Sequence, residues 1–136
     1  MANYKVIDVE GIGPQMAVKL NEAGIVNTDQ LLAACKTPAL RSELASKTGI
    51  SDKLILRFAN MVDLFRITGV GAQYADLLEA SGVDTVVELA NRNPDNLAAK
   101  MEEVNAEKHL VRRTPPAASV KKWVLEAKTL PRVLEY

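Results

Sequence analysis

The chain has 136 residues, a length that suits one compact domain or two small helical halves that share an interface. Hydrophobic residues make up 48% of the sequence and charged residues 25%, so the chain has enough apolar side chains for a core and is not expected to be disordered. The 17 basic residues balance the 17 acidic residues, which excludes a global field that would attract DNA or an anionic membrane. Any nucleic-acid binding must therefore come from local patches.

The sequence also indicates a reducing, cytoplasmic setting. Cys35 is the only cysteine, so an intrachain disulfide is impossible, and its place after the run QLLAA is typical of a small core residue. No window has the apolar length of a membrane span, and the N-terminal run MANYKVIDVE lacks the apolar region of a signal peptide. We expect no membrane partner.

The segment at residues 9–25, VEGIGPQMAVKLNEAGI, is repeated at residues 67–83 as ITGVGAQYADLLEASGV, without a gap. In both copies a glycine on each side of one apolar residue predicts a tight turn, because glycine reaches backbone conformations that strain other residues. A helix is predicted to follow each turn, because Pro14 suits a first helical position and Gly24 suits a C-cap. The paired positions of the two copies are Gly11 and Gly69, Gly13 and Gly71, Ala17 and Ala75, Leu20 and Leu78, Gly24 and Gly82, and Leu31 and Leu89.

Each copy is predicted to continue with three more helices. The second begins at a capping box, complete at Thr85 and weaker at Asn27. The third begins where a cap residue precedes a proline, at Pro38 and again at Pro94. The fourth runs from Ser51 to about residue 65 and recurs near the C-terminus. Its apolar positions are Ile55, Phe58, Val62 and Phe65, matched by Val120, Trp123, Ala127 and Leu130. No strand pattern appears beyond the short lead-in YKVIDV, so the chain is predicted to be all-helical.

The pattern hydrophobic-x-Gly-hydrophobic-Gly-x-x-x-Ala-x-x-Leu, followed by Ala-Gly-Ile, resembles the helix-hairpin-helix superfamily. The tandem arrangement, with the tail at residues 103–131, resembles more narrowly a bacterial family catalogued as a domain of unknown function, in which two such units run in succession. The likeness covers the chain from about Val6 to Pro131. It implies an all-α fold of two tandem helix-hairpin-helix units, SAM-domain-like helical bundles, packed into one compact body. Residues 1–66 would form the first unit with an extended N-terminal lead-in, and residues 67–136 the second, with a basic insertion and the C-terminal helix.

The resemblance implies a function, because DNA-binding members of the superfamily bind a DNA phosphate through backbone N–H groups of the hairpin, without reading bases. Free N–H groups and the positive end of a helix dipole also make such a turn an anion site on physical grounds. Two hairpins can hold two phosphates, which fixes position but not sequence. The second hairpin, which follows a long helix, is the better candidate. The matching residues are Gly11, Ile12, Gly13 and Gln15 in the first copy, and Gly69, Val70, Gly71 and Gln73 in the second.

The charge around the hairpins departs from the DNA-binding pattern. Members of the superfamily often carry a cation two residues beyond the second glycine, where this chain has Gln15 and Gln73, so most of the counterion-release contribution is missing. Each turn can equally be a corner between packed helices, and each cation can belong to a solvated face. Positive charge is predicted to come from Lys19, Arg66 and a late basic cluster that contains Lys108, Arg112 and Arg113.

Catalysis is not expected. The runs GIGPQM and GVGAQY lack the third glycine and the βαβ unit of a dinucleotide-binding loop, and one histidine with one cysteine cannot furnish a usual zinc site. Trp123 is predicted to be a core anchor rather than a platform for stacked bases. We therefore predict a non-catalytic protein, without metal or cofactor, that binds duplex DNA weakly and without sequence preference. The alternative is a protein-interaction or assembly adaptor, monomeric or homodimeric, with Met16, Met61 and Met101 on its faces, although a core role is the default for these methionines.

Overall fold

A computed structural model of the chain describes residues 3–136 and contains eight α-helices and one short 3-10 helix, with no strand among these residues. The prediction of an all-helical chain is confirmed. The elements are η1 (Val6–Asp8), α1 (Pro14–Glu22), α2 (Thr28–Ala34), α3 (Pro38–Thr48), α4 (Asp52–Leu64), α5 (Ala72–Ala80), α6 (Val86–Ala90), α7 (Pro94–Lys108) and α8 (Ala117–Ala127). Residues 1 and 2, which open the predicted first unit, lie outside the described part. None of the helices in residues 3–136 has the length and apolar character that a membrane crossing requires.

The repeated turns and helix ends have the predicted local geometry. Gly13 and Gly71 are the N-cap residues of α1 and α5, both with extended backbone. After α1 the N–H of Ile25 donates to the carbonyl oxygen of Leu20 over 2.9 Å, which is the Schellman pattern. Gly24 takes a left-handed φ of 86°, which glycine adopts without strain. The second copy ends its helix in the same way.

The capping boxes are the reverse of what the sequence predicts. The complete box is the one at Asn27, whose side chain accepts from the Gln30 N–H while the Gln30 side chain accepts from the Asn27 N–H. At Thr85 the hydroxyl oxygen accepts from the Glu88 N–H, but the Glu88 carboxylate accepts from the Asp84 N–H instead. The start of α6 is therefore fixed by one bond of the box and not by two.

The sequence predicts an extended N-terminal lead-in, and its described part is extended at Lys5 but not at residues 6–8. Its residues 6–8 form the 3-10 helix η1, and Lys5 forms an isolated antiparallel bridge with Asn27. The backbone N–H of Tyr4 donates to Oγ1 of Thr28, and the Thr28 N–H donates back to the Tyr4 carbonyl oxygen. The lead-in is thereby fastened across the start of α2. The Tyr4 ring then packs edge-on against Phe65, with ring centroids 5.3 Å apart.

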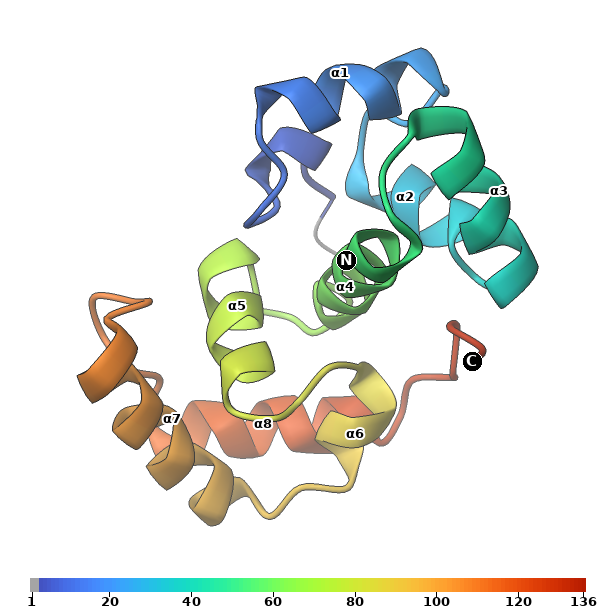
Figure 1. The fold of residues 1–136 in the computed structure, drawn as a ribbon. Helices are drawn as coiled ribbons and strands as arrows, with labels where there is room; N and C mark the ends of the chain where they lie inside the picture. The colour runs from blue at the N-terminus through green and yellow to red at the C-terminus, as the bar shows by residue number, and fades with distance from the viewer. Residues whose placement is uncertain (1–2) are drawn as a thin grey trace.

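The core runs through both halves because α4 packs against α2 and α3 on one side and against α5 on the other. Figure 1 shows this arrangement, with the green helix α4 between α1–α3 and α5–α8. Phe58 in α4 and Trp123 in α8 are buried, as predicted from their equivalent positions. Met61 and Met101 fill the core as well, so two of the three methionines weighed for an interaction face are not on the surface. Burial raises the pKa of Cys35 to about 12, which keeps its thiol protonated and unreactive.

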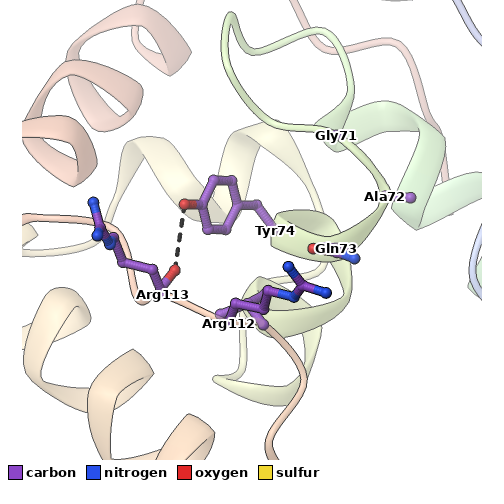
Figure 2. Close-up of a pocket in the computed structure, with 7 residues that line it drawn as sticks. Gly71, Ala72, Gln73, Tyr74, Arg112 and Arg113 are labelled. Carbon is purple, nitrogen blue, oxygen red and sulfur yellow. Dashed lines mark hydrogen bonds between the residues drawn. The ribbon is translucent and has the colours of Figure 1, made fainter.

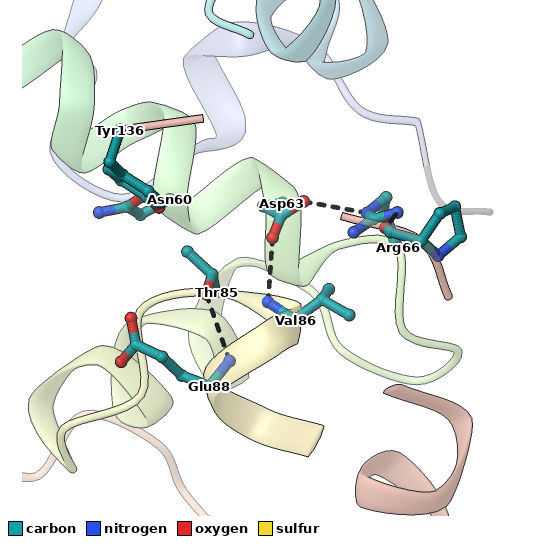
Figure 3. A network of polar contacts seen from close by, with 8 residues as sticks. Asn60, Asp63, Arg66, Thr85, Val86, Glu88 and Tyr136 are labelled. Carbon is teal, nitrogen blue, oxygen red and sulfur yellow. Dashed lines mark hydrogen bonds and ion pairs between the residues drawn. The ribbon is translucent and has the colours of Figure 1, made fainter. Parts of the chain in front are cut away.

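A buried ion pair joins the end of α4 to the second half (Figure 3). Nε of Arg66 donates to Oδ1 of Asp63 over 2.9 Å. Oδ2 of Asp63 accepts from the backbone N–H of Val86 at the start of α6, also at 2.9 Å. Nη1 of Arg66 donates to the carbonyl oxygen of Pro131 over 2.8 Å, which ties the C-terminal tail to the same pair. One carboxylate and one guanidinium therefore connect three segments of the chain.

The C-terminal tail, residues 131–136, crosses back to the first half. Nη2 of Arg41 in α3 donates to the carbonyl oxygen of Glu135 over 2.8 Å. The Tyr136 ring lies 5.5 Å from the Arg41 guanidinium, and its hydroxyl bonds Oδ1 of Asn60 in α4 at 2.6 Å. The tail thus bridges both halves on one side of α4.

Candidate nucleic-acid interface

The second hairpin and the arginine pair, which are far apart in the sequence, line one pocket. This pocket has a volume of about 430 Å³ and lies at the start of α5. Figure 2 shows the Arg112 guanidinium extending toward Gln73, whereas the Arg113 guanidinium points away from it. The structure therefore brings together the second hairpin and the arginine pair, which the sequence analysis predicts separately as phosphate contacts. The lining residues are Gly71, Ala72, Gln73, Tyr74, Val111, Arg112 and Arg113.

The backbone of residues 71–74 has free hydrogen-bond donors at this pocket. The first N–H groups of a helix have no intrahelical acceptor, and none of these four donates a hydrogen bond within residues 3–136. The N-cap Gly71 has no side chain to accept from them. Just before the hairpin, the Glu126 carboxylate of α8 accepts from the Thr68 N–H and hydroxyl, which fixes the turn on α8. Uncapped amides at a helix start attract anions.

The loop that carries the arginine pair is held in place by polar contacts to two helices. The C-cap residue of α7 is His109, which takes a left-handed conformation with a φ of 52°. The Asn105 side chain then binds Val111 twice, donating to its carbonyl oxygen at 3.0 Å and accepting from its N–H at 2.9 Å. The Tyr74 hydroxyl donates to the carbonyl oxygen of Arg113 over 3.4 Å. Both arginine side chains remain exposed at the edge of α5.

The first hairpin has fewer free donors and no equivalent arginine loop. At the positions equivalent to 71–74, the unpaired N–H groups are those of Gly13, Gln15 and Met16, because Pro14 at the first helical position has none. Gln15 is exposed, like its counterpart Gln73. The two hairpins therefore differ in donor number as well as in surroundings.

Acidic side chains surround the first hairpin. Burial, together with the charges of Glu10 and Glu79, raises the pKa of Asp76 on α5. Arg57 pairs with Glu79 at 3.1 Å and lies 3.8 Å from Asp76, so its charge is already matched by carboxylates. The carboxylates of Glu10, Asp76 and Glu79 disfavour a phosphate at this turn, and the Arg57 guanidinium beside Gly11 offsets them only in part. The first hairpin is the poorer anion site of the two.

Three predicted cations do not line the pocket. Arg66 must be withdrawn from the predicted phosphate contacts, because it is buried and ion-paired with Asp63. Lys19 lies in the last turn of α1, at the opposite end from the hairpin amides. Lys108 ends α7, where its charge acts on Asp76. Of the predicted cations, Arg112 and Arg113 are the two that line this pocket.

Two of the predicted amide donors also need correction. The N–H of Ile12 donates to the carbonyl oxygen of Val9 at 3.0 Å, and the N–H of Val70 donates to that of Ile67 at 3.1 Å. These bonds close the turns, so neither N–H is free for a phosphate. The apolar side chains of Ile12 and Val70 are buried and anchor the turns in the core.

The sequence patterns do not point to four residues of the site: Ala72, Tyr74, Val111 and Asn105. Ala72 and Tyr74 can be found by a general rule, because the first N–H groups of any helix are unpaired. No local signal marks Asn105, since its contact with Val111 depends on the left-handed turn at His109. Residues 3–136 contain no group of three His, Cys, Asp or Glu side chains that could hold a metal ion.

The fold and the pocket define a compact all-helical protein with an internal repeat and an anion-compatible pocket at a helix start. The chain belongs to the family described as a domain of unknown function, DUF4332, whose model matches residues 10–130. The predicted resemblance to an uncharacterised family is confirmed to that extent. No curated protein and no solved structure matches the chain.

Proposed function

We propose that this chain is a tandem helix-hairpin-helix protein that binds duplex DNA without sequence preference, mainly through its second hairpin. The observation that carries the proposal is the pocket that joins the free N–H groups of residues 71–74 to Arg112 and Arg113. Amides at a helix start favour negative charge, and arginine forks match the geometry of phosphate. Such contacts hold the DNA backbone and carry no base information.

The tandem identity is supported by the order of the elements. α1–α4 and α5–α8 follow one another in the same sequence, and each set starts at a Gly-x-Gly turn. In this proposal the first hairpin is a structural corner, because Glu10 and Asp76 give it a negative environment. One copy of the repeat binds phosphate and the other only turns the chain.

The expected affinity is modest, because the chain has no net charge and a single pocket neutralises only a few phosphates. For about two neutralised phosphates, binding should weaken about tenfold between about 50 and 200 mM salt. The test is the fluorescence anisotropy of a labelled random-sequence duplex, titrated with the protein at both salt concentrations.

The variant that tests the second hairpin most directly is Gln73→Glu, which puts a carboxylate at the pocket. The fold should survive, because an acidic residue in the first turn of a helix is favourable. DNA affinity should fall about tenfold or more, through repulsion of phosphate. The matched control is Gln15→Glu, the same change at the equivalent exposed position of the first hairpin, with an expected effect within about twofold. Equal losses in the two variants would contradict the assignment to the second hairpin.

The role of the two arginines is tested against a control that removes the same number of positive charges elsewhere. Arg112→Ala should weaken binding more than Arg113→Ala, because only Arg112 extends toward Gln73. The double change Lys121→Ala/Lys122→Ala removes two exposed cations from α8 and should weaken binding less than Arg112→Ala/Arg113→Ala. Circular dichroism checks that each variant folds. Absence of binding by the natural chain at low salt would reject the DNA proposal.

A second candidate function, protein interaction, is favoured by a different observation. Ile7, Val18 and Val26 are exposed, and they line one groove on the first half. None of the residues of this groove lines the phosphate pocket. The two functions use separate surfaces and are compatible.

A further inference from the structure

An apolar groove with a volume of about 240 Å³ lies on the first half, between η1, α1 and the segment before α2. The side chains of Ile7, Val18 and Val26 line it and are 44%, 54% and 51% exposed. Lys5 lines the groove too and forms no ion pair within residues 3–136. The groove therefore gathers three of the seven large hydrophobic side chains that are exposed within residues 3–136.

The internal repeat identifies the element that covers the equivalent face in the second half. By the alignment of the two copies, Val18 corresponds to Asp76 and Val26 to Asp84. Helix α4 packs on this face of α5, where Arg57 lies 3.8 Å from Asp76 and lines a pocket together with Asp84. The covering element in the second half is therefore a helix. Within residues 3–136 the element before the first hairpin is η1, a 3-residue 3-10 helix, and Val18 on this face of α1 is 54% exposed.

The side chains on this face are acidic in the second half and apolar in the first half. Beside α4, the equivalent positions in the second half are carboxylates: Asp76 lies 3.8 Å from Arg57, and Asp84, in the turn after α5, lines a pocket with Lys53 and Arg57. Where no helix covers α1, the equivalent positions are the exposed valines Val18 and Val26. If these two positions only faced water, valine would have no advantage over the aspartates of the second half. A pair of valines does suit the apolar stripe of a docked helix.

We propose that this groove binds an amphipathic helix of another protein, placed on α1 as α4 is placed on α5. The docked helix would carry aliphatic residues at two positions four apart, where α4 has Lys53 and Arg57, and these would face Val18 and Val26. An acidic residue at the edge of this stripe would meet Lys5. The binding is of the helix-in-groove kind, in which apolar anchors at helical spacing supply the affinity. It does not depend on the phosphate pocket.

A second copy of this chain suits the groove less well. Its helix α4, which fits such a face, already packs against α2, α3 and α5. Two grooves set face to face in a symmetric pair would leave both unfilled and would bring two Lys5 side chains together. A separate helix fills the groove and avoids that repulsion.

The test uses the full chain, isotope-labelled for NMR, and two synthetic helical peptides. The first peptide has a leucine stripe with two facing leucines four residues apart and a glutamate at its edge. The second peptide differs only in having lysine and arginine at the two facing positions, as α4 has. We expect the leucine peptide to shift the methyl signals of Ile7, Val18 and Val26. The affinity of the cationic peptide should be lower by about tenfold or more.

The matched variant is Val18→Asp/Val26→Asp, which introduces the residues that the second half carries at the equivalent positions. Both positions are about half exposed, so the core is not disturbed. The variant should lose affinity for the leucine peptide by about tenfold or more and should prefer the cationic peptide. DNA binding by the second hairpin should be unchanged, which separates this result from a failure of the proposed DNA function.

Two peptide results would overturn the proposal: absence of methyl shifts at the three residues, or equal binding of the leucine peptide by the natural chain and the variant. Sedimentation of the natural chain is measured without peptide. Association that depends on concentration and is abolished by Val18→Asp/Val26→Asp would assign the face to contact between copies and would overturn it too.

Discussion

At the scale of single residues, the glycines of the hairpins have different roles. Gly11 has a φ of 92°, and a Cβ atom there would lie 2.8 Å from Nη1 of Arg57 and 3.2 Å from Cε1 of Phe58. Gly69 also has a positive φ, but its nearest neighbour, Nε1 of Trp123, would be 3.5 Å away. Gly13 has extended backbone and no neighbour within 4 Å. The same Gly-x-Gly pattern therefore contains positions of unequal tolerance.

We expect Gly11→Ala to lower the free energy of unfolding by about 2 kcal/mol or more, because a left-handed backbone strains an L-residue by about 1–2 kcal/mol and nearby side chains must also move. Gly69→Ala should cost about 1–2 kcal/mol through the backbone alone. Gly13→Ala is the comparison and should cost less, about 1 kcal/mol at most, because alanine is a poorer N-cap residue than glycine. Urea unfolding followed by circular dichroism measures all three. Equal losses at Gly11 and Gly13 would contradict this ranking.

At the scale of elements, the loop after α7 determines whether the arginine pair lies beside α5. Asn105→Ala removes both hydrogen bonds to Val111 and leaves every charge in place. Each bond contributes about 1 kcal/mol to the fixed loop position, so we expect DNA affinity to fall by about thirtyfold at most. Anisotropy at low salt measures the change, and faster hydrogen exchange of the Val111 amide would report the loosened loop independently.

The control for the loop is Asn91→Ala. Its side chain also bonds the backbone, donating to the carbonyl oxygen of Val87 at the end of α6. That bond does not touch the pocket, so DNA affinity should stay as in the natural chain. Faster exchange at Val111 with unchanged affinity in Asn105→Ala would show that the arginine loop does not contribute to binding.

Asp76 on α5 and Asp84 in the turn after it lie beside α4 and are carboxylates whose ionisation opposes folding. Burial, with Glu10 and Glu79, raises the pKa of Asp76, and burial with Glu79 raises that of Asp84. The folded chain therefore binds these two protons more tightly than the unfolded chain, whose pKa is the ordinary 3.8. The two groups add stability as the pH falls from neutral through their folded pKa values to 3.8.

Asp76→Asn/Asp84→Asn should accordingly raise the free energy of unfolding near neutral pH. The gain should shrink as the pH approaches about 4, because the natural carboxyl groups then become protonated as well. Urea unfolding across this range measures the gain, with Glu102→Gln on the exposed surface of α7 as the control. A gain that increases toward acid pH would show that the sign of this argument is wrong.

The helix boundaries follow from the sequence because they depend on local signals. The side chains of Thr37 and Asn93 accept backbone N–H groups at the starts of α3 and α7, each before a proline, as predicted. The role of Arg66 does not follow, because its partner at Pro131 lies far along the chain. The meeting of the second hairpin with the arginine pair is not predictable either, because the course of that loop depends on a left-handed histidine, His109. The division of the chain at residue 66 stays a prediction.

At the scale of the whole molecule, Arg41 connects the first half to the tail. Its guanidinium donates to the carbonyl oxygens of Cys35 and Glu135, each at 2.8 Å. Arg41→Lys keeps the charge and loses this fork, so the free energy of unfolding should fall by about 1–3 kcal/mol. Thermal and urea unfolding measure the loss. Arg132→Lys, on the exposed part of the tail, is the control, and an equal loss there would contradict a specific role for Arg41.

The two proposed surfaces lie on different halves of the molecule. The phosphate pocket belongs to α5 and the loop after α7, and the apolar groove belongs to η1 and α1. A chain that used both would hold a partner helix and a DNA duplex at the same time. Its role would be to place that partner on DNA.

The attachment of the tail also bears on the order of folding. Arg41 and Glu135 are separated by 94 residues. Closing a flexible loop of that length costs about 4 kcal/mol of chain entropy, more than the few hydrogen bonds of the tail can offset. The tail can dock only after the intervening helices have shortened the loop by folding. We expect residues 131–136 to be the last segment to fold, and the Glu135 amide to exchange with solvent well before the buried amide of Val86.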